Sequence, residues 1–255
     1  MKLVLKILFT ALLLGNISLA KEIRFIHITD IGLNTKNAYK LQNTIKEINS
    51  FKDIDFIVFG GNNISKTNIN NLNTFLYLLR KTNKKSYVLL GSSDVLSSSG
   101  INKEYYLKRV NRTLWFRHSK KPNYVFKKKN VVFVAMDGSK EYFQSTNGYY
   151  TKQELLWLEK TLEKYKDKNI IILQHFPLLE TDSKWLETVK TEPYYDLLSK
   201  YNNIKAIISG HYNNNLEIQK DGIYHIVTES YNKNSAYKVI ELDFDNNFIG
   251  TYLVK

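Results

Sequence analysis

The sequence predicts an α/β domain in which two β-sheets lie between layers of helices. Helical patterns separate apolar runs of strand length, and from residue 215 onward short strands follow one another directly. Such alternation followed by a β-rich end is typical of sheets and helices stacked in layers. The six apolar runs lie at residues 23–29, 55–59, 86–90, 130–136, 169–174 and 204–209.

Most of these six runs are nearly continuous rather than alternating. Continuous apolar sequence is typical of strands that are buried on both faces, as the strands of parallel sheets are. Thr151, with Glu154 three residues later, predicts a capping box at the start of a helix. The helical patterns cover residues 37–49, 70–82, 151–165 and 192–201.

The end of the chain reads as four further strands joined by short turns, such as the Lys-Asp-Gly turn at 220–222. These strands are expected at 215–220, 223–228, 236–243 and 248–254. The chain contains no internal repeat and no linker rich in proline, glycine or serine. Residues 21–255 are therefore expected to form one domain.

Composition excludes several classes of protein. With no cysteine, the chain has no disulfide, no thiolate metal site and no cysteine nucleophile. A hydrophobic content of 43% supports a real core and excludes a disordered basic tail. The net charge is +13, but 32 of the 37 basic residues are lysine, whereas readers of nucleic acid usually depend on arginine. Nucleic acid is therefore not the expected partner.

Residues 1–20 have the pattern of a secretory signal peptide. Lys2 and Lys6 precede and interrupt an apolar run, which ends in small residues before Ala20. The run after Lys6 is too short for a helix that crosses a membrane, and no later segment is apolar enough to do so. We therefore expect cleavage near Ala20 and export to the periplasm or the medium. The alternatives are a buried strand or an uncleaved anchor.

Polar loops follow five of the apolar strands. In open α/β sheets, ligands bind beyond the carboxyl ends of the strands, so these loops should converge on one edge and form a candidate site. The residues concerned are Asp30, Gly61-Asn62-Asn63, Gly91-Ser92-Ser93-Asp94, His175 and Gly210-His211-Tyr212-Asn213.

The order and spacing of these loops resemble those of the calcineurin-like metallophosphoesterases. That family carries the motifs D-x-H, G-D-x-x, G-N-H-D, H-x-P and G-H-x-H at its strand ends, where this chain has HITDIG, FGGNNIS, LLGSSD, QHFP and SGHYN. The match extends along nearly the whole chain after residue 20. It implies a four-layer α/β/β/α sandwich of two mixed sheets flanked by helices. It also implies hydrolysis of phosphate esters at a two-metal centre.

The resemblance fails at most of the metal ligands. Three of the seven ligand positions match, namely Asp30, His175 and His211. The others are replaced by Gly32, Asn62 at the metal-bridging position, Ser92 and Asn213. Two divalent cations about 4 Å apart repel by roughly 17 kcal/mol at a dielectric constant near 20, and an uncharged bridging residue cannot offset this repulsion. The expected cofactor is none, or a single zinc, manganese or iron ion.

Catalysis is affected separately, because Ser93 replaces the histidine that acts on the leaving group in the family. Loss of such an acid typically costs about 10²–10⁴ in rate, so no catalytic residue is assigned. The residues that remain as candidates for binding an anion are Asn62, Ser92, Ser93, Asp94 and Asn213. The alternative is that small polar residues simply suit tight loops, with Asp94 capping its own loop.

A basic segment at residues 108–129 exceeds the diffuse lysine background. It holds nine lysines and arginines and no acidic residue, with aromatic residues interleaved. This composition is typical of binding to polyanionic surfaces. The alternative is a solvated loop and edge hairpin whose aromatic residues belong to the core.

Three hypotheses for function follow from these patterns. The first is an exported member of the phosphoesterase family that binds an anionic or phosphate-bearing ligand, or a partner, with little or no turnover. The second is a residual hydrolase with one metal at His175 and His211, completed by Asp30, which would polarise a phosphoryl oxygen or activate water. The third is a module that binds anionic surfaces through residues 108–129.

Overall fold

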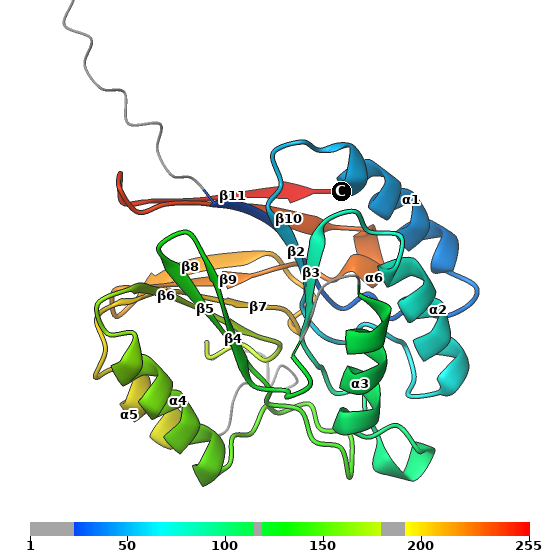
Figure 1. Cartoon of the computed structure of the whole chain (residues 1–255), viewed down its shortest axis with the longest axis horizontal. Coiled ribbons are helices and arrows are strands. Elements are labelled where there is room, and N and C mark those ends of the chain that lie inside the picture. Colours follow the sequence, from blue (N-terminus) through cyan, green and yellow to red (C-terminus); the bar gives the residue numbers. More distant parts are fainter. Residues whose placement is uncertain (1–22, 115–118, 180–191) are drawn as a thin grey trace, which may run out of the picture.

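Two mixed β-sheets face each other between two layers of helices in the computed structural model, which describes residues 23–114, 119–179 and 192–255 (Figure 1). This arrangement confirms the predicted four-layer α/β/β/α sandwich. The predicted signal peptide lies outside the described residues. None of the helices in the described ranges is long and apolar enough to cross a membrane.

The first sheet has the strand order β11-β10-β1-β2-β3. Its first three strands in sequence run parallel, and the two C-terminal strands add to it in antiparallel orientation. These strands are β1 (Ile23–Ile28), β2 (Phe56–Phe59), β3 (Lys85–Val88), β10 (Tyr237–Asp243) and β11 (Phe248–Val254). The parallel strands bring the loops after β1, β2 and β3 to one edge.

The second sheet has the order β4-β5-β6-β7-β9-β8. Strands β5, β6, β7 and β9 run parallel, while β4 and β8 pair antiparallel at the two edges. The bounds are β4 (Tyr124–Lys128), β5 (Val131–Met136), β6 (Asn169–Gln174), β7 (Ile204–Ser209), β8 (Leu216–Lys220) and β9 (Ile223–Val227).

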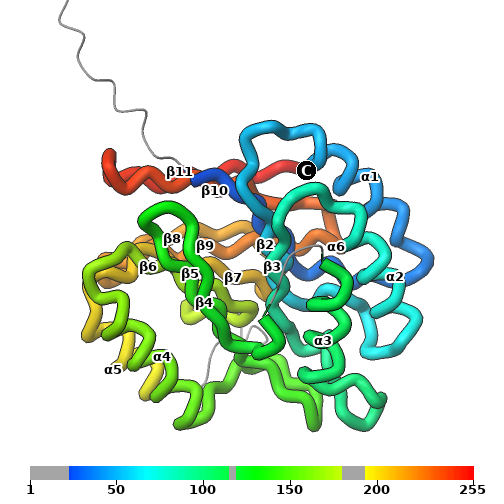
Figure 2. The backbone as a smooth tube through the Cα atoms, viewed as in Figure 1, coloured from blue at the N-terminus to red at the C-terminus, as the bar shows by residue number. Residues whose placement is uncertain are grey.

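Each sheet carries its own helical layer, as the path of the chain in Figure 2 shows. Helices α1 (Ala38–Ser50), α2 (Ile69–Leu79) and α3 (Lys103–Thr113) share a core with the first sheet. Helices α4 (Lys152–Lys164) and α5 (Glu192–Leu198) share one with the second sheet. A short helix, α6 (Tyr231–Asn234), and a 3-10 turn (Ser97–Ser99) complete the elements.

The predicted elements are present, with ends within three residues of those expected. The capping box at the start of α4 is confirmed, since the side chains of Thr151 and Glu154 each bond the other's backbone N–H. Sequence patterns do not predict α3, whose charged face hides a narrow apolar stripe that includes the fully buried Tyr106 and Val110. Strand β4 forms an edge hairpin with β5, as one of the two interpretations of residues 108–129 has it.

Aromatic packing fills the space between the sheets. Phe25 of β1 stacks on Phe56 of β2 with ring centroids 4.7 Å apart, and both meet the ring of Phe133 from β5 edge-on. Burying such rings contributes about 1.5–3 kcal/mol each. The two sheets are therefore held together chiefly by apolar contact.

Two polar cross-links also join the sheets next to this apolar core. The ring of His27 on β1 is completely buried, and its Nδ1 lies 2.7 Å from the hydroxyl of Thr228, just after β9. On β10, the buried Lys238 donates from Nζ to Glu217 of β8 at 2.6 Å and to the carbonyl of Val227 at 3.3 Å. Burial, and then the nearby Lys238 charge, lowers the pKa of His27 to about 3.

Stability should consequently fall in acid through His27. The unfolded chain gains a proton on this histidine below about pH 6.5, whereas the folded chain does so only near pH 3, so the free energy of unfolding drops across that window. This shift in the pKa of His27 corresponds to a loss of roughly 5 kcal/mol in the free energy of unfolding by about pH 3. Urea unfolding at pH 7 and pH 4 should show that His27→Gln loses less stability over this range than the wild type. An equal loss in both proteins would contradict the assignment.

Candidate functional site

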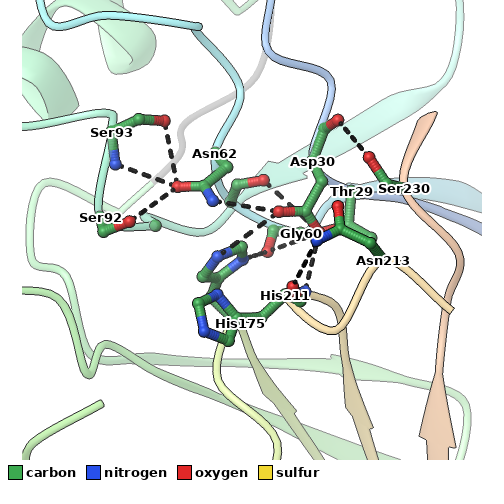
Figure 3. A network of polar contacts seen from close by, with 12 residues as sticks. Thr29, Asp30, Gly60, Asn62, Ser92, Ser93, His175, His211, Asn213 and Ser230 are labelled. Carbon is green, nitrogen blue, oxygen red and sulfur yellow. Dashed lines mark hydrogen bonds and ion pairs between the residues drawn. The ribbon is translucent and has the colours of Figure 1, made fainter. Parts of the chain in front are cut away.

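The five polar strand-end loops converge where the two sheets meet (Figure 3). Asp30, Asn62 and the loop with Ser92 and Ser93 follow β1, β2 and β3 of the first sheet, while His175 and His211 follow β6 and β7 of the second. The backbone N–H of His211 donates to Asp30 Oδ2 at 2.7 Å, and the ring of His175 bonds the carbonyl of Gly60. The predicted convergence is thus present, and it draws on both sheets.

Asp30 lies at the centre of the site and is nearly buried. Its Oδ2 accepts from His211 N and, at 3.1 Å, from the hydroxyl of Thr29, while its Oδ1 accepts from Asn62 Nδ2 at 3.0 Å. From the far side of the loop, the hydroxyl of Ser230 donates to the Asp30 carbonyl at 3.2 Å. The carboxylate is therefore satisfied by neutral donors.

Asn62 connects the Asp30 loop to the loop after β3. Its Nδ2 donates to Asp30, and its Oδ1 accepts from the backbone N–H of Ser93, both at 3.0 Å. The hydroxyl of Ser93 also lies 3.0 Å from this oxygen, but it is closer to the Ile64 carbonyl, at 2.6 Å. The hydroxyl of Ser92 approaches Asn62 Oδ1 at 3.4 Å. An amide can donate on one side and accept on the other, which a carboxylate cannot do. The Asn62 amide thus joins the two loops without any charge of its own.

His175 is completely buried, and its hydrogen bond fixes its tautomer. Nδ1 lies 2.8 Å from the carbonyl of Gly60, which can only accept, so Nδ1 carries the proton in the neutral ring. Nε2 then presents a lone pair, and among the described residues it has no hydrogen-bond partner. It lies 3.7 Å from Asp30 Oδ1. This nitrogen is therefore an unsatisfied ring atom at the centre of the site.

His211 and Asn213 line the site from the loop after β7. The ring of His211 lies 5.3 Å from that of His175, and the ring of Phe176 packs 4.9 Å from each of them. Asn213 donates from Nδ2 to the His211 carbonyl at 3.2 Å. Both residues are partly exposed, so this loop forms the accessible side of the site.

Four of the site residues adopt the left-handed backbone conformation that side chains normally avoid. The φ angles are 51° at Asp30, 51° at Asn62, 70° at His211 and 57° at Asn213. Such conformations cost of order 1–3 kcal/mol each and cluster at sites that bind ligands. The hydrogen bonds between the loops hold these residues in place.

Asp94 lies beneath the site, with no exposed surface. Its oxygens accept from the backbone N–H groups of Gly91 at 2.8 Å and Ile64 at 3.1 Å, and from Asn63 Nδ2 at 3.1 Å. Burial raises the pKa of this carboxyl to about 7, although the backbone donors oppose the change. Asp94 therefore caps its own loop, as one of the two sequence interpretations proposed.

The donor set does not fit a resident metal as it stands. Within residues 23–114, 119–179 and 192–255, no three histidine or acidic side chains are grouped so that they could hold an ion. Asp30 and His175 approach one another, but the N–H of Asn62 points at the same Asp30 oxygen that a metal would need. The nitrogen and oxygen ligands of a zinc site must all lie about 2.0–2.2 Å from one point.

Sequence patterns do not identify several contributors to the site. Thr29 falls at the end of the strand predicted at 23–29, where a threonine is an ordinary residue, and in the structure it directly follows β1. Ser230 comes from the segment after β9, which carries no strand-end motif. Phe176 lies in the QHFP loop, but only the fold shows that it packs on both histidine rings.

The fold and these strand-end loops define an α/β/β/α sandwich of the phosphoesterase type. The family model for calcineurin-like phosphoesterases matches residues 23–213, and the chain belongs to that family. This membership confirms the resemblance found in the motifs.

Curated relatives of this chain are phosphodiesterases. A probable glycerophosphodiester phosphodiesterase of Arcobacter nitrofigilis is 25% identical over 67% of this chain, which spans 61% of the relative's length. The 3',5'-cyclic adenosine monophosphate phosphodiesterase of Vibrio vulnificus is 33% identical over 33% of this chain and 32% of its own length. The matched residues of this chain thus cover less than two thirds of the length of either relative.

Solved structures share the fold at low sequence identity. A dimetal phosphatase from Danio rerio has a TM-score of 0.68 at 13% identity, covering 91% of this chain and 98% of its own. GAP50, the anchor in the inner membrane complex of Plasmodium, has a TM-score of 0.62 at 20% identity, covering 92% and 84%.

Proposed function

We propose that this chain binds a phosphate-bearing or other anionic ligand at the strand-end site, with little or no turnover. The observation that carries the proposal is the Asn62 cross-link, in which an uncharged amide bonds Asp30 on one side and the backbone N–H of Ser93 on the other. These bonds satisfy the groups that would otherwise need a cation. The loops can therefore keep their arrangement without any metal.

At the position where the family has the histidine that acts on the leaving group, this chain has Ser93. The hydroxyl of Ser93 donates to the carbonyl of Ile64 at 2.6 Å, so its proton is already engaged. A serine hydroxyl is moreover far too weak an acid to replace a histidine near neutral pH. Binding without turnover is the function that this arrangement supports best.

The partly exposed polar residues of the site come from both sides of Asp30. Ser92 and Ser93 are partly exposed after β3, and His211 and Asn213 are partly exposed after β7. Neutral donors and a histidine can hydrogen-bond a phosphate group. Because the curated relatives are phosphodiesterases, a phosphodiester is the first ligand class to test. Export follows from the signal pattern of residues 1–20 and is part of the same proposal.

A second candidate is binding of a single divalent metal with residual hydrolysis, and the His175 geometry favours it. A ring whose Nδ1–H bonds a backbone carbonyl has the orientation usual for histidines that ligate metals through Nε2. The 3.7 Å between Nε2 and Asp30 Oδ1 is near the roughly 3.4 Å that separates two ligands on a tetrahedral zinc. The Asn62 amide would have to turn, and His211 would have to move, before a third ligand was in place.

Calorimetry and activity assays should separate the two candidates. We expect sn-glycero-3-phosphoethanolamine to bind without being hydrolysed, and no stoichiometric zinc, manganese or iron. His211→Asn, chosen because asparagine tolerates positive φ, should weaken binding about tenfold, as loss of one good hydrogen bond to an anion does. The matched control is His225→Asn, which removes a histidine from β9 outside the site.

Two results would overturn the binding proposal. Absence of any heat or thermal shift with the phosphodiester would remove its ligand. Stoichiometric metal, together with hydrolysis of bis(p-nitrophenyl) phosphate or p-nitrophenyl phosphate that is lost in His211→Asn, would establish the metal-dependent alternative.

A further inference from the structure

A basic hollow of about 250 Å³ lies between the edge strands of the two sheets, away from the candidate site. Its walls come from the start of β2, the start of β3 with the turn before it, and the end of β4. The lining residues are Asp55, Phe56, Asn83, Lys84, Lys85, Tyr87, Lys127 and Lys128. We call this feature the basic hollow.

Aromatic stacking joins the two edge strands beside the basic hollow, which Tyr87 lines. The ring of Tyr87 on β3 stacks on that of Phe126 on β4, with centroids 3.5 Å apart and planes within 7°. Close by, the hydroxyl of Tyr124 donates to the carbonyl of Val88 at 3.1 Å. Strands from different sheets are thus pinned together, and the lysines beside them are held on a fixed frame.

The basic hollow carries an excess of positive charge. Four lysines line it, with Asp55 as the one carboxylate. Asp55 is already engaged, since its Oδ1 pairs with Lys128 Nζ at 2.6 Å and its Oδ2 accepts from the backbone N–H of Arg24 at 3.1 Å. Among the described residues, Lys84 and Lys85 have no ion-pair partner. Lys127 Nζ lies 4.6 Å from the ring centre of Tyr165, a contact that leaves its charge unneutralised.

The basic segment 108–129 does not form one continuous surface at the basic hollow. Its N-terminal part lies on α3, in the helical layer of the first sheet, where Arg109 donates to Asn73 at 2.6 Å. Residues 115–118 lie outside the described residues. Tyr124 is buried, and Phe126 stacks within the edge-strand cluster. These two aromatic residues, on which a nucleic acid could stack, therefore face protein. The positive charge that gathers at the basic hollow comes from the lysines of β4 together with Lys84 and Lys85, which lie outside that segment.

We propose that the basic hollow binds a compact, multiply charged phosphate anion, such as an oligophosphate or a multiply phosphorylated small molecule. A concave space with several unneutralised lysines suits a ligand that carries several charges in a small volume. Lysines act here as point charges on flexible stems, so they can surround phosphate oxygens in more than one geometry. This site goes beyond the proposed function, because it lies at the opposite ends of β2 and β3 from Asn62 and Ser93.

Calorimetry with inorganic tripolyphosphate tests the proposal on the full chain. We expect binding at one site that weakens as salt rises, because the lysines are solvent-accessible. The double variant Lys84→Gln/Lys85→Gln should weaken this binding roughly tenfold, the effect of losing two exposed ion pairs. The matched control, Lys40→Gln/Lys46→Gln, removes the same charge from the exposed face of α1 and should change affinity by less than about twofold.

A second arm separates this site from the strand-end site and from a lipid surface. His211→Asn should leave tripolyphosphate affinity unchanged while it weakens phosphodiester binding. Failure of the wild-type chain to bind the phosphodiester, with tripolyphosphate still bound, would overturn only the proposed function. Equal weakening in both lysine double variants would assign the binding to diffuse charge and overturn the inference. Binding to phosphatidylcholine vesicles that contain phosphatidylserine, without binding to tripolyphosphate, would also overturn it in favour of a membrane surface.

Discussion

Asn62→Asp is expected to lower the free energy of unfolding by about 2–4 kcal/mol at neutral pH, which combines a lost hydrogen bond with repulsion between partly buried carboxylates. The change replaces the N–H that now lies 3.0 Å from Asp30 Oδ1 with a second carboxylate oxygen. The side chains at positions 30 and 62, which now form a hydrogen bond, would then repel each other. Urea unfolding in the presence of a chelator measures the loss.

The same variant should acquire two dependences that the wild type lacks. Two facing carboxylates share a proton, so the pKa of one is raised, and the stability difference between this variant and the wild type should shrink as the pH falls towards about 4. Zinc or manganese should also raise the melting temperature of Asn62→Asp, because a cation between the introduced carboxylate and Asp30 would replace the repulsion. The substitution would restore the charge that the bridging position has in the family.

Asn232→Asp is the matched control for this experiment. It introduces the same charge on α6 near the site, at an exposed asparagine whose Oδ1 already accepts a hydrogen bond from Asn37. A carboxylate can accept that bond equally well, so stability should change by less than about 0.5 kcal/mol. If Asn62→Asp proved as stable as this control without metal, the Asn62 cross-link would not hold the loops together.

Gly91→Ala is expected to cost about 3 kcal/mol or more, because it overpacks a place with no room for a methyl group. A Cβ at Gly91 would collide with the backbone nitrogen of Asn62 and lie 2.9 Å from its Cγ. The backbone of the β2 loop cannot swing aside as a side chain could. The substitution should therefore separate the loops after β2 and β3, and abolish phosphodiester binding along with the Asn62–Ser93 bonds.

Gly100→Ala provides the comparison. Gly100 has φ of 74°, yet a Cβ there would meet nothing within 4 Å. Its cost should be confined to the left-handed backbone, about 1 kcal/mol. Thermal and urea unfolding of the two variants compare steric collision with backbone strain directly. A smaller loss in Gly91→Ala than in Gly100→Ala would show that the loops after β2 and β3 can move apart freely.

Both predictions test one physical idea, that neutral hydrogen bonds maintain these loops. In a two-metal centre, charge attraction to cations gathers carboxylates and histidines in one place. Here Asp30 receives N–H and O–H donors instead, and Asn62 donates and accepts at once. Those bonds hold the backbone of Asp30 and Asn62 in the left-handed conformation.

The four layers and the place of the site could be predicted from the sequence. Continuous apolar runs such as 169–174 indicate buried strands, and polar residues that follow parallel strands must meet at one edge of a sheet. The replacement of the bridging carboxylate by Asn62 is likewise written in the sequence. These features depend on local pattern and on residue identity, which a sequence records directly.

The roles of those residues could be assigned only from the three-dimensional arrangement of the chain. Which way the Asn62 amide points, that His175 Nε2 lacks a partner among the described residues, and that Ser230 reaches Asp30 all depend on distances between segments far apart in the chain. The basic hollow also needed the fold, because Lys84 and Lys127 are separated in sequence and meet only where edge strands of two sheets adjoin. Hydrogen bonds and electrostatic fields act over a few ångströms in space, and sequence separation does not report that distance.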